Sequence, residues 1–279
     1  MTTVAGVGEL GLLELIKPYL GRHAGGDDAA VLESGSPFTV VSTDMAVEGV
    51  HFDLTWMSAE DAGWRALALA LGDLAAKGAT PAWALTSVAM PRSWHVDSFT
   101  GLFAGIHALA SKSSIAIEGG DMSAINGPAV ISITVAGHAD KEPLPRSAAR
   151  PGWAIGVTGP LGGSAVALRN RKAVRLEPLL AEGRRLNAAG LCCGDISDGL
   201  VRELDKFAAM AGVGYSIEED QVPVAAGATR ADAVTSGEEV ELVCVGPDEL
   251  IRATSLHRVG VLTDAPNHPG EPTGYDHFA

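Results

Sequence analysis

Five short motifs place aspartates beside apolar stretches, and this pattern most constrains how the chain can fold. The motifs are GDDAA at 26–30, STD at 42–44, LGDLAAKGA at 71–79, EGGD at 118–121 and GDISDGL at 194–200. A buried carboxylate costs several kcal/mol unless a positive charge lies beside it. Lys77 is the only lysine or arginine within these motifs. The fold therefore needs another cation, and oxygen ligands without histidine or cysteine clusters favour Mg²⁺, Mn²⁺ or Ca²⁺ over zinc.

Charge and composition narrow the classes of partner. The 279-residue chain is 47% hydrophobic, 19% charged and has a net charge of −14. This composition is typical of a globular protein with one large or two medium domains. The negative charge argues against nucleic acid or an anionic membrane as partner. A phosphate-bearing substrate would also be repelled unless metal ions reverse the local charge.

The cysteines and the N-terminal segment bear on localisation. Cys192, Cys193 and Cys244 show no CxxC spacing, so we expect them to pack as small apolar residues in a reducing cytoplasm. The first residues lack a basic n-region and a cleavage pattern, so no signal peptide is expected. No apolar run reaches the roughly 18 residues that a membrane span requires.

Periodicity predicts a mixed α/β unit in the first half of the chain. Helical spacing of apolar residues and strand-like runs alternate there. The predicted helices are 9–17, 58–78 and 96–111, and the predicted strands are 38–44, 82–90, 114–118 and 129–137.

A proline-rich, charged stretch at 140–152 has no periodicity and predicts a domain boundary. We therefore expect a metal- and nucleotide-binding domain at 1–142 and a second α/β domain at 143–279. The second domain should contain strands at 153–159, 213–219 and 239–246 and helices at 160–168, 179–190 and 199–211.

Asp73 is the sharpest candidate ligand, because it is the only polar side chain in the eleven residues 66–76. Such an apolar helix should be mostly buried, so metal binding is favoured over a cap satisfied by backbone donors. Ser42, Thr43 and Asp44 follow a buried-looking strand and suit a hard cation, although such triplets are also common in turns.

The other motifs each have a structural alternative. Gly120 and Asp121 follow a predicted strand, so the glycines could form a turn or admit a phosphate. Ser197 or Asp198 could cap a helix, which leaves Asp195 unexplained, or the helix start could bind phosphate. Arg146 is either surface charge or a polyphosphate ligand. His51 is more often a turn residue than a ligand.

Several familiar nucleotide-binding and hydrolytic signatures are missing from the sequence. GPLGGS at 159–164 lacks the lysine of a Walker A loop. The protein-kinase motifs, HExxH and GxSxG are absent as well.

In order and spacing, the motifs resemble those of the thiamine-monophosphate kinase family, in the aminoimidazole-ribonucleotide-synthetase-like superfamily. GDDAA, STDMAVEGVHF, DLAAKGATPAW, GGD, RSAARPG, DISDGL and GYDHF cover nearly the whole chain. The resemblance implies ATP-dependent phosphorylation of thiamine monophosphate with several Mg²⁺ ions. It also implies a two-domain α+β (mixed α/β) fold, whose N-terminal sheets form a β-barrel across a homodimer.

The resemblance also implies residue roles. Metal ions would be held by Asp28, Ser42, Thr43, Asp44, Asp73, Asp121, Asp195 and Asp198. ATP would be bound by Gly120, Asp121, Arg146 and Ser197, and thiamine phosphate would be bound by His51, Glu238 and Tyr275. Asp44, Asp121 and Asp198 would be the catalytic residues. Transfer between two polyanions needs charge neutralisation and alignment more than a strong base, which agrees with this residue set.

The chain departs from the family pattern on the substrate side. Residues 236–242 read SGEEVEL where the family shows a GGEDYEL-like motif, and the segments 170–180 and 246–274 are short. Two alternatives follow: another ATP-using enzyme of the superfamily, or a non-catalytic nucleotide- or metal-binding module.

The strand at 129–137 also predicts assembly. Ile131, Ile133 and Val135 form one apolar face, and the opposite face is uncharged as well. Two helices can cover only one face, so we expect the sheet of a second subunit to cover the other.

Overall fold

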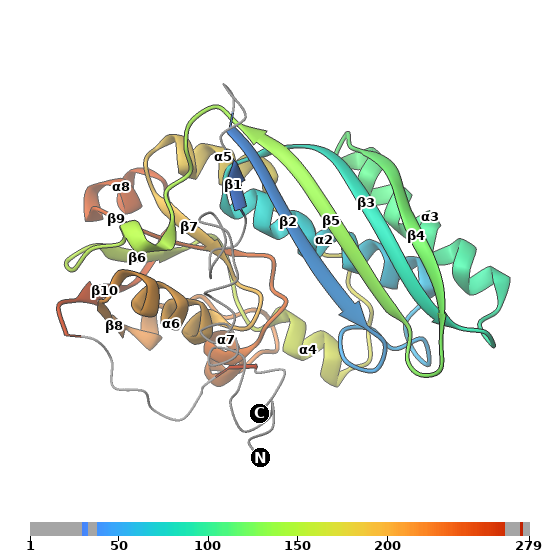
Figure 1. The fold of residues 1–279 in the computed structure, drawn as a ribbon. Coiled ribbons are helices and arrows are strands. Elements are labelled where there is room, and N and C mark those ends of the chain that lie inside the picture. Colours follow the sequence, from blue (N-terminus) through green and yellow to red (C-terminus); the bar gives the residue numbers. More distant parts are fainter. Residues whose placement is uncertain (1–29, 33–37, 266–273, 276–279) are drawn as a thin grey trace, which may run out of the picture.

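The computed structural model describes residues 30–32, 38–265 and 274–275, and it contains two five-stranded sheets joined through helix packing (Figure 1). The first sheet has the order β1-β2-β5-β3-β4, and the second has the order β7-β9-β6-β10-β8. The mixed α/β fold expected from the sequence is confirmed. No helix within the described ranges is long and apolar enough to cross a membrane.

The first half of the chain consists of the first sheet, whose strands are long except for β1, and of two long helices. Its elements are β1 (Ala30–Leu32), β2 (Phe38–Val47), α2 (Ala59–Ala76), β3 (Thr80–Pro91), α3 (Val96–Lys112), β4 (Ala116–Ile125) and β5 (Val130–Ala139). Ser58 begins α2 as the sequence predicts, because its side chain accepts a hydrogen bond from the backbone N–H of Asp61.

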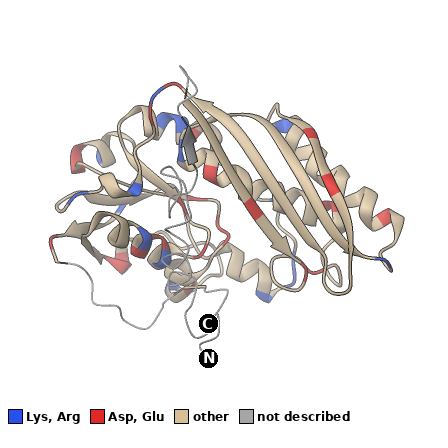
Figure 2. Ribbon diagram, in the orientation of Figure 1, with Lys and Arg blue, Asp and Glu red and all other residues tan. Residues whose placement is uncertain are grey.

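One face of this sheet packs on α2 and α3, which lie behind the strands in Figure 1. Ile131, Ile133 and Val135 point to the helices and are at most 1% exposed. Among the described residues no element covers the opposite face. Strands β2 to β5 contain no lysine or arginine, and Figure 2 shows few charged residues along them.

The second half has shorter elements. They are η2 (Arg146–Ala148), β6 (Ala154–Val157), α4 (Gly163–Arg169), α5 (Leu180–Ala188), β7 (Cys192–Asp195), α6 (Leu200–Ala211), β8 (Gly214–Ile217), η3 (Glu219–Gln221), α7 (Arg230–Thr235), β9 (Leu242–Gly246), α8 (Asp248–Ala253) and β10 (His257–Thr263). The predicted boundary at 142 and 143 falls between β5 and η2, and it stays a prediction.

Helices cover both faces of the second sheet. Leu204 and Phe207 of α6 pack on one face, and Leu186 of α5 and Ile251 of α8 pack on the other. The end of α2 joins this second layer through Ala75 and Ala76, so α2 contributes to the cores of both halves. All three cysteines are buried in these layers without a disulfide, as the sequence predicts.

The structure corrects several predicted elements. The sequence-based prediction did not include β1, β7, β10, α7 and α8, and all of these except β10 are six residues or shorter. The predicted strand at 114–118 continues as β4 to Ile125, so Gly120 and Asp121 do not form a turn. Strand β9 begins only at Leu242, because Glu238 and Val240 have positive φ angles. The predicted helix 9–17 lies outside the described residues.

Candidate functional site

A group of acidic side chains lies where α2, β2 and β7 meet. Asp73 lies near the end of α2, is 9% exposed and accepts a hydrogen bond from the hydroxyl of Ser42 on β2. Asp195, the last residue of β7, is 5% exposed. A Cβ placed on Gly72 would lie 3.1 Å from Asp195 Oδ2, so this carboxylate packs against α2 at Gly72, the residue that precedes Asp73. Three predicted metal ligands are thus neighbours.

The register of β2 adds Asp44 to the same side of the sheet. Asp44 pairs with Ile133, whose side chain faces the helices, whereas Thr43 pairs with Thr134. The hydroxyls of Thr43 and Thr134 lie 3.0 Å apart on the uncovered face. Because side chains alternate along a strand, Ser42 and Asp44 can serve one site, and the Thr43 side chain points away from it.

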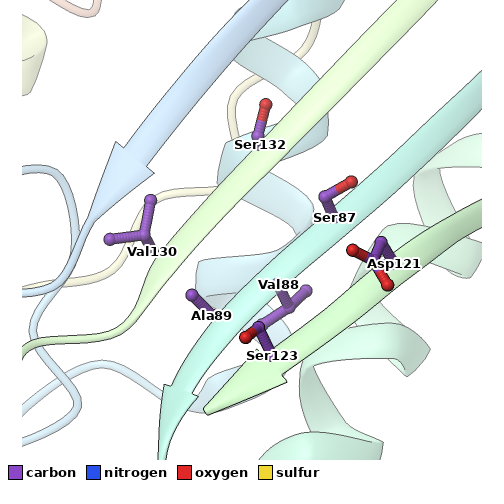
Figure 3. Close-up of a pocket in the computed structure, with 7 residues that line it drawn as sticks. All are labelled: Ser87, Val88, Ala89, Asp121, Ser123, Val130 and Ser132. Atoms are coloured by element: carbon purple, nitrogen blue, oxygen red, sulfur yellow. The ribbon is translucent and has the colours of Figure 1, made fainter. Parts of the chain in front are cut away.

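Asp121 also lies on the uncovered face. It forms a row with Ser87 of β3, Ser132 of β5 and Met45 of β2, according to the strand register. Figure 3 shows Asp121, Ser87 and Ser132 along a shallow pocket on this face. One chain therefore does not bring Asp121 to the group formed by Ser42, Asp44, Asp73 and Asp195.

Gly120 has a structural reason to be glycine. A Cβ at this position would lie 1.7 Å from the carbonyl oxygen of Thr86 on the paired strand β3. The missing side chain therefore permits strand pairing. A role of Gly120 in binding ATP stays a prediction.

Asp198 belongs to a chain of partly and fully buried charges around the start of α6. Lys206 Nζ lies 3.0 Å from Asp198 Oδ2 and 3.3 Å from Glu203 Oε2. Glu203 is fully buried and accepts a 2.6 Å hydrogen bond from Nε of Arg146, which is 2% exposed. Burial alone would lower the pKa of Lys206, but the carboxylates of Glu203 and Asp198 raise it well above its usual value.

This arrangement excludes the helix-cap interpretation of the DISDGL motif, and phosphate binding at this helix start stays a prediction. The N-cap of α6 is Gly199, which has a φ of 108° and no side-chain cap, so neither Ser197 nor Asp198 caps the helix. Asp198 pairs with Lys206, a residue that the sequence analysis did not single out. Arg146 is held by Glu203 inside the molecule, so it is not ordinary surface charge.

The loop before α6 also gathers the predicted substrate residues. The backbone N–H of Glu238 donates to Ser197 O at 2.6 Å, and that of Tyr275 donates to Asp198 O at 3.1 Å. Tyr275 is 47% exposed. Two segments that are distant in sequence, one of them the altered SGEEVEL motif, therefore contact Ser197 and Asp198.

Arg65 connects this assembly to the first half of the chain. Its Nε donates to the carbonyl oxygen of His51 at 3.1 Å, and its guanidinium forms an ion pair with Glu238. The His51 ring is fixed in turn, because its Nδ1 accepts the backbone N–H of Val47 at 3.1 Å. His51 and Glu238, predicted to bind one substrate, are thus joined by one side chain of α2.

The second glutamate of the SGEEVEL segment has a structural role. Glu239 accepts hydrogen bonds from the backbone N–H groups of Gly163 and Ser164, both at 3.2 Å, and from the Ser236 hydroxyl at 2.6 Å. Burial raises its pKa. The family pattern has aspartate at this position, and in this chain the side chain of Glu239 reaches the start of α4.

The donor atoms fit a hard divalent cation in part. Ser42, Asp44, Asp73 and Asp195 offer only oxygen, which is the ligand type that Mg²⁺ prefers. Within the part of the chain that the structure describes, no three His, Cys, Asp or Glu side chains already converge as a metal cluster. Asp121 faces away, Asp198 is paired with Lys206, and the predicted ligand Asp28 lies outside the described residues.

Comparison with known proteins agrees with this geometry. Residues 26–139 match the domain family described as AIR synthase related protein, N-terminal domain. The thiamine-monophosphate kinase of Rhodopirellula baltica is 36% identical over 245 residues, which cover 80% of this chain and 76% of that protein. The chain belongs to the thiamine-monophosphate kinase family.

Two further members of the family span nearly the whole chain. The thiamine-monophosphate kinase of Bacillus subtilis is 28% identical over 322 aligned positions, covering 97% of this chain and 99% of that protein. The solved structure of AaThiL complexed with AMPPCP and TMP superposes with a TM-score of 0.88 at 25% identity and covers 99% of both chains. The short segments of the second half therefore remain within the family fold.

Proposed function

We propose that this protein transfers the γ-phosphoryl group of ATP to the phosphate of thiamine monophosphate, producing thiamine diphosphate and ADP. The supporting observation is that Glu238 and Tyr275 both contact the Ser197–Asp198 loop, which follows Asp195 directly, and that Arg65 connects His51 to Glu238. The similarity to the family, including a relative solved with AMPPCP and TMP, supports the same reaction.

The proposed transfer is direct. An oxygen of the substrate phosphate attacks the γ-phosphorus of ATP, the bond from that phosphorus to the bridging oxygen breaks, and ADP leaves. The attacking oxygen is ionised near neutral pH, so this chain needs no strong general base. Its residues instead align the two anions and exclude water. Mg²⁺, when bound, would neutralise charge on the triphosphate of ATP and on the substrate phosphate.

We assign Ser42, Asp44, Asp73 and Asp195 to metal binding, together with Asp28. Asp198 joins them when its contact with Lys206 is exchanged for one with the metal. Arg146 and Ser197 are proposed to bind ATP. The acidic residues near Asp73 would repel the phosphates of both substrates, and cations bound there would reverse the local charge, which supports a magnesium requirement.

A homodimer is part of the same proposal. The uncovered face of the first sheet carries Met45 at 59% exposure and Leu85 at 38% exposure, and its strands contain no lysine or arginine. A second copy packed on this face would bury these residues. It would also bring Asp121 and Thr43 to the subunit interface, where they could serve the partner's site. A cytoplasmic location is consistent with the three buried cysteines, which form no disulfide.

An ADP-release assay tests the function. We expect ADP release to require thiamine monophosphate and a divalent cation, and thiamine diphosphate to accumulate in equal amount. ADP release that does not depend on thiamine monophosphate would indicate another ATP-using enzyme of the superfamily. Nucleotide binding without any turnover would favour a non-catalytic module.

A further inference from the structure

Arg65 occupies a position that the reaction scheme above does not use. It lies on α2, and its side chain is 13% exposed. Its two interactions reach residues from both halves of the chain: Nε donates to the carbonyl oxygen of His51 at 3.1 Å, and the guanidinium pairs with Glu238. The side chain therefore ties the turn after β2 to the segment before β9.

Glu238 is held from several sides. Its φ angle is 57°, in the left-handed region that non-glycine residues rarely adopt. Its N–H donates to Ser197 O at 2.6 Å, and its carbonyl oxygen accepts the Ser164 hydroxyl at 2.7 Å. Arg65 then binds Oε2 of the carboxylate. A strained backbone held by this many contacts is typical of a functional residue.

The second carboxylate oxygen is left for another donor. Among the described residues, Glu238 Oε1 is buried and has no hydrogen-bond partner. An unsatisfied buried oxygen of this kind is costly, so a bound molecule with an N–H group would gain by filling it. The aminopyrimidine ring of thiamine carries such N–H groups.

We propose that Arg65 is a positioning residue that determines specificity for the thiamine part of the substrate. It occupies Oε2 of Glu238, so that Oε1 faces the substrate, and it fixes the main chain of His51 beside it. The inference rests on the proposed function, because it identifies what assembles the acceptor site of that reaction.

The chemistry of arginine suits this role. A guanidinium presents N–H groups along more than one edge, so it can serve a carbonyl oxygen and a carboxylate at the same time. A lysine ammonium would keep the charge but not this fixed geometry. Arg65→Lys should therefore retain part of the function, and Arg65→Met should lose it.

A double-mutant cycle distinguishes positioning from direct contact with the substrate phosphate. The variants are Arg65→Met, Glu238→Ala and the double variant, with Kd for thiamine monophosphate measured by calorimetry and KM measured for each substrate. We expect Arg65→Met to raise Kd and KM for thiamine monophosphate about tenfold or more, which corresponds to one lost charged hydrogen bond. KM for ATP should stay within about twofold, and Arg65→Lys should fall between wild type and Arg65→Met.

In the Glu238→Ala background, Arg65→Met should cost little more, because no carboxylate remains to be oriented. An equal cost in both backgrounds would mean that Arg65 meets the substrate directly and would overturn the proposal. Equal losses for ATP and thiamine monophosphate would also overturn it.

Lys112→Met is the matched control, since Lys112 also pairs with a carboxylate, Glu177, but at a 57% exposed site. It should leave the kinetics unchanged. A wild-type protein that turns over thiamine monophosphate, with an unaffected Arg65→Met variant, defeats the role of Arg65 alone. A wild-type protein that neither binds nor phosphorylates thiamine monophosphate defeats the proposed function and this inference together.

Discussion

At the scale of single residues, the candidate site consists of carboxylates whose negative charge the fold brings together. Asp73 and Asp195 are nearly buried, and Ser42 donates to Asp73. Like charges at short range repel, so carboxylates in such a group destabilise one another, and a bound cation would reduce this repulsion. Residues selected for binding cations should therefore reduce stability in their absence.

We expect Asp44→Asn and Asp121→Asn to abolish phosphoryl transfer while leaving the fold intact or more heat-stable. Asp44→Asn relieves repulsion within the acidic group, whereas Asp121 lies on the opposite face, so its loss should leave the stability unchanged. Both substitutions remove a predicted metal contact. ADP release would measure the effect on activity, and thermal melting in EDTA would measure the effect on stability. Asp97→Asn, at the exposed start of α3, is the control and should change neither. An activity loss below about tenfold, which corresponds to roughly 1.4 kcal/mol in the barrier, would remove Asp44 or Asp121 from the mechanism.

Lys206 carries a second prediction at this scale. Its ammonium group neutralises Asp198 and the fully buried Glu203. We expect Lys206→Met to lower the melting temperature in EDTA and to enlarge the increase in melting temperature that Mg²⁺ produces, because the metal then meets an unpaired Asp198. Lys112→Met again serves as the control.

The pH dependence of this contribution has a definite sign. The pKa of folded Lys206 is raised above its ordinary value of 10.5, so its stabilising effect is fully present below that value and is lost only at higher pH. The melting difference between wild type and Lys206→Met should therefore not change between about pH 6 and 9. A difference that disappears within this range would contradict the assigned ion pairs.

At the scale of elements, α2 is the part on which the site depends. It carries Arg65 and Asp73 and packs on α3 through two glycines. A Cβ on Gly63 would lie 2.0 Å from the carbonyl oxygen of Leu102, and one on Gly105 would lie 1.8 Å from that of Glu60. The backbones of the two helices therefore touch, and this contact fixes how α2 presents its polar residues.

Gly105→Ala should be destabilising, by about 1 to 3 kcal/mol, because the added methyl group pushes α3 away from α2. Urea unfolding would measure it. Gly101→Ala on the same helix is the matched control: its Cβ would lie 3.3 Å from the Ala59 side chain, so the cost should be much smaller. Equal effects of the two substitutions would mean that the helix contact is looser than the structure indicates.

At the scale of the whole molecule, the uncovered sheet face predicts assembly. Light scattering at micromolar concentration should give about twice the 28.6 kDa chain mass. Met45→Glu places a charge on this face and should shift the protein to monomers with little activity. Val96→Glu, at a 75% exposed position on α3, should leave the dimer intact. A stable, active wild-type monomer would show that this face serves another purpose.

Local patterns in the sequence determined much of the fold. The long helices α2 and α3 and the strand β5 have strong periodicity, so their type and approximate position could be predicted. The short elements β7, α7 and α8 could not, since four to six residues hold too little periodicity. The aspartate motifs identified most of the candidate site because apolar surroundings make a carboxylate conspicuous.

Only the tertiary structure decided how these residues are grouped. Strand register put Asp44 and Asp121 on opposite faces of one sheet, and a motif read along the chain carries no information about a neighbouring strand. Lys206 and Arg65 look like ordinary helix charges in the sequence. Their roles follow from partners brought close by folding, because an ion pair depends on distance in space rather than on separation along the chain.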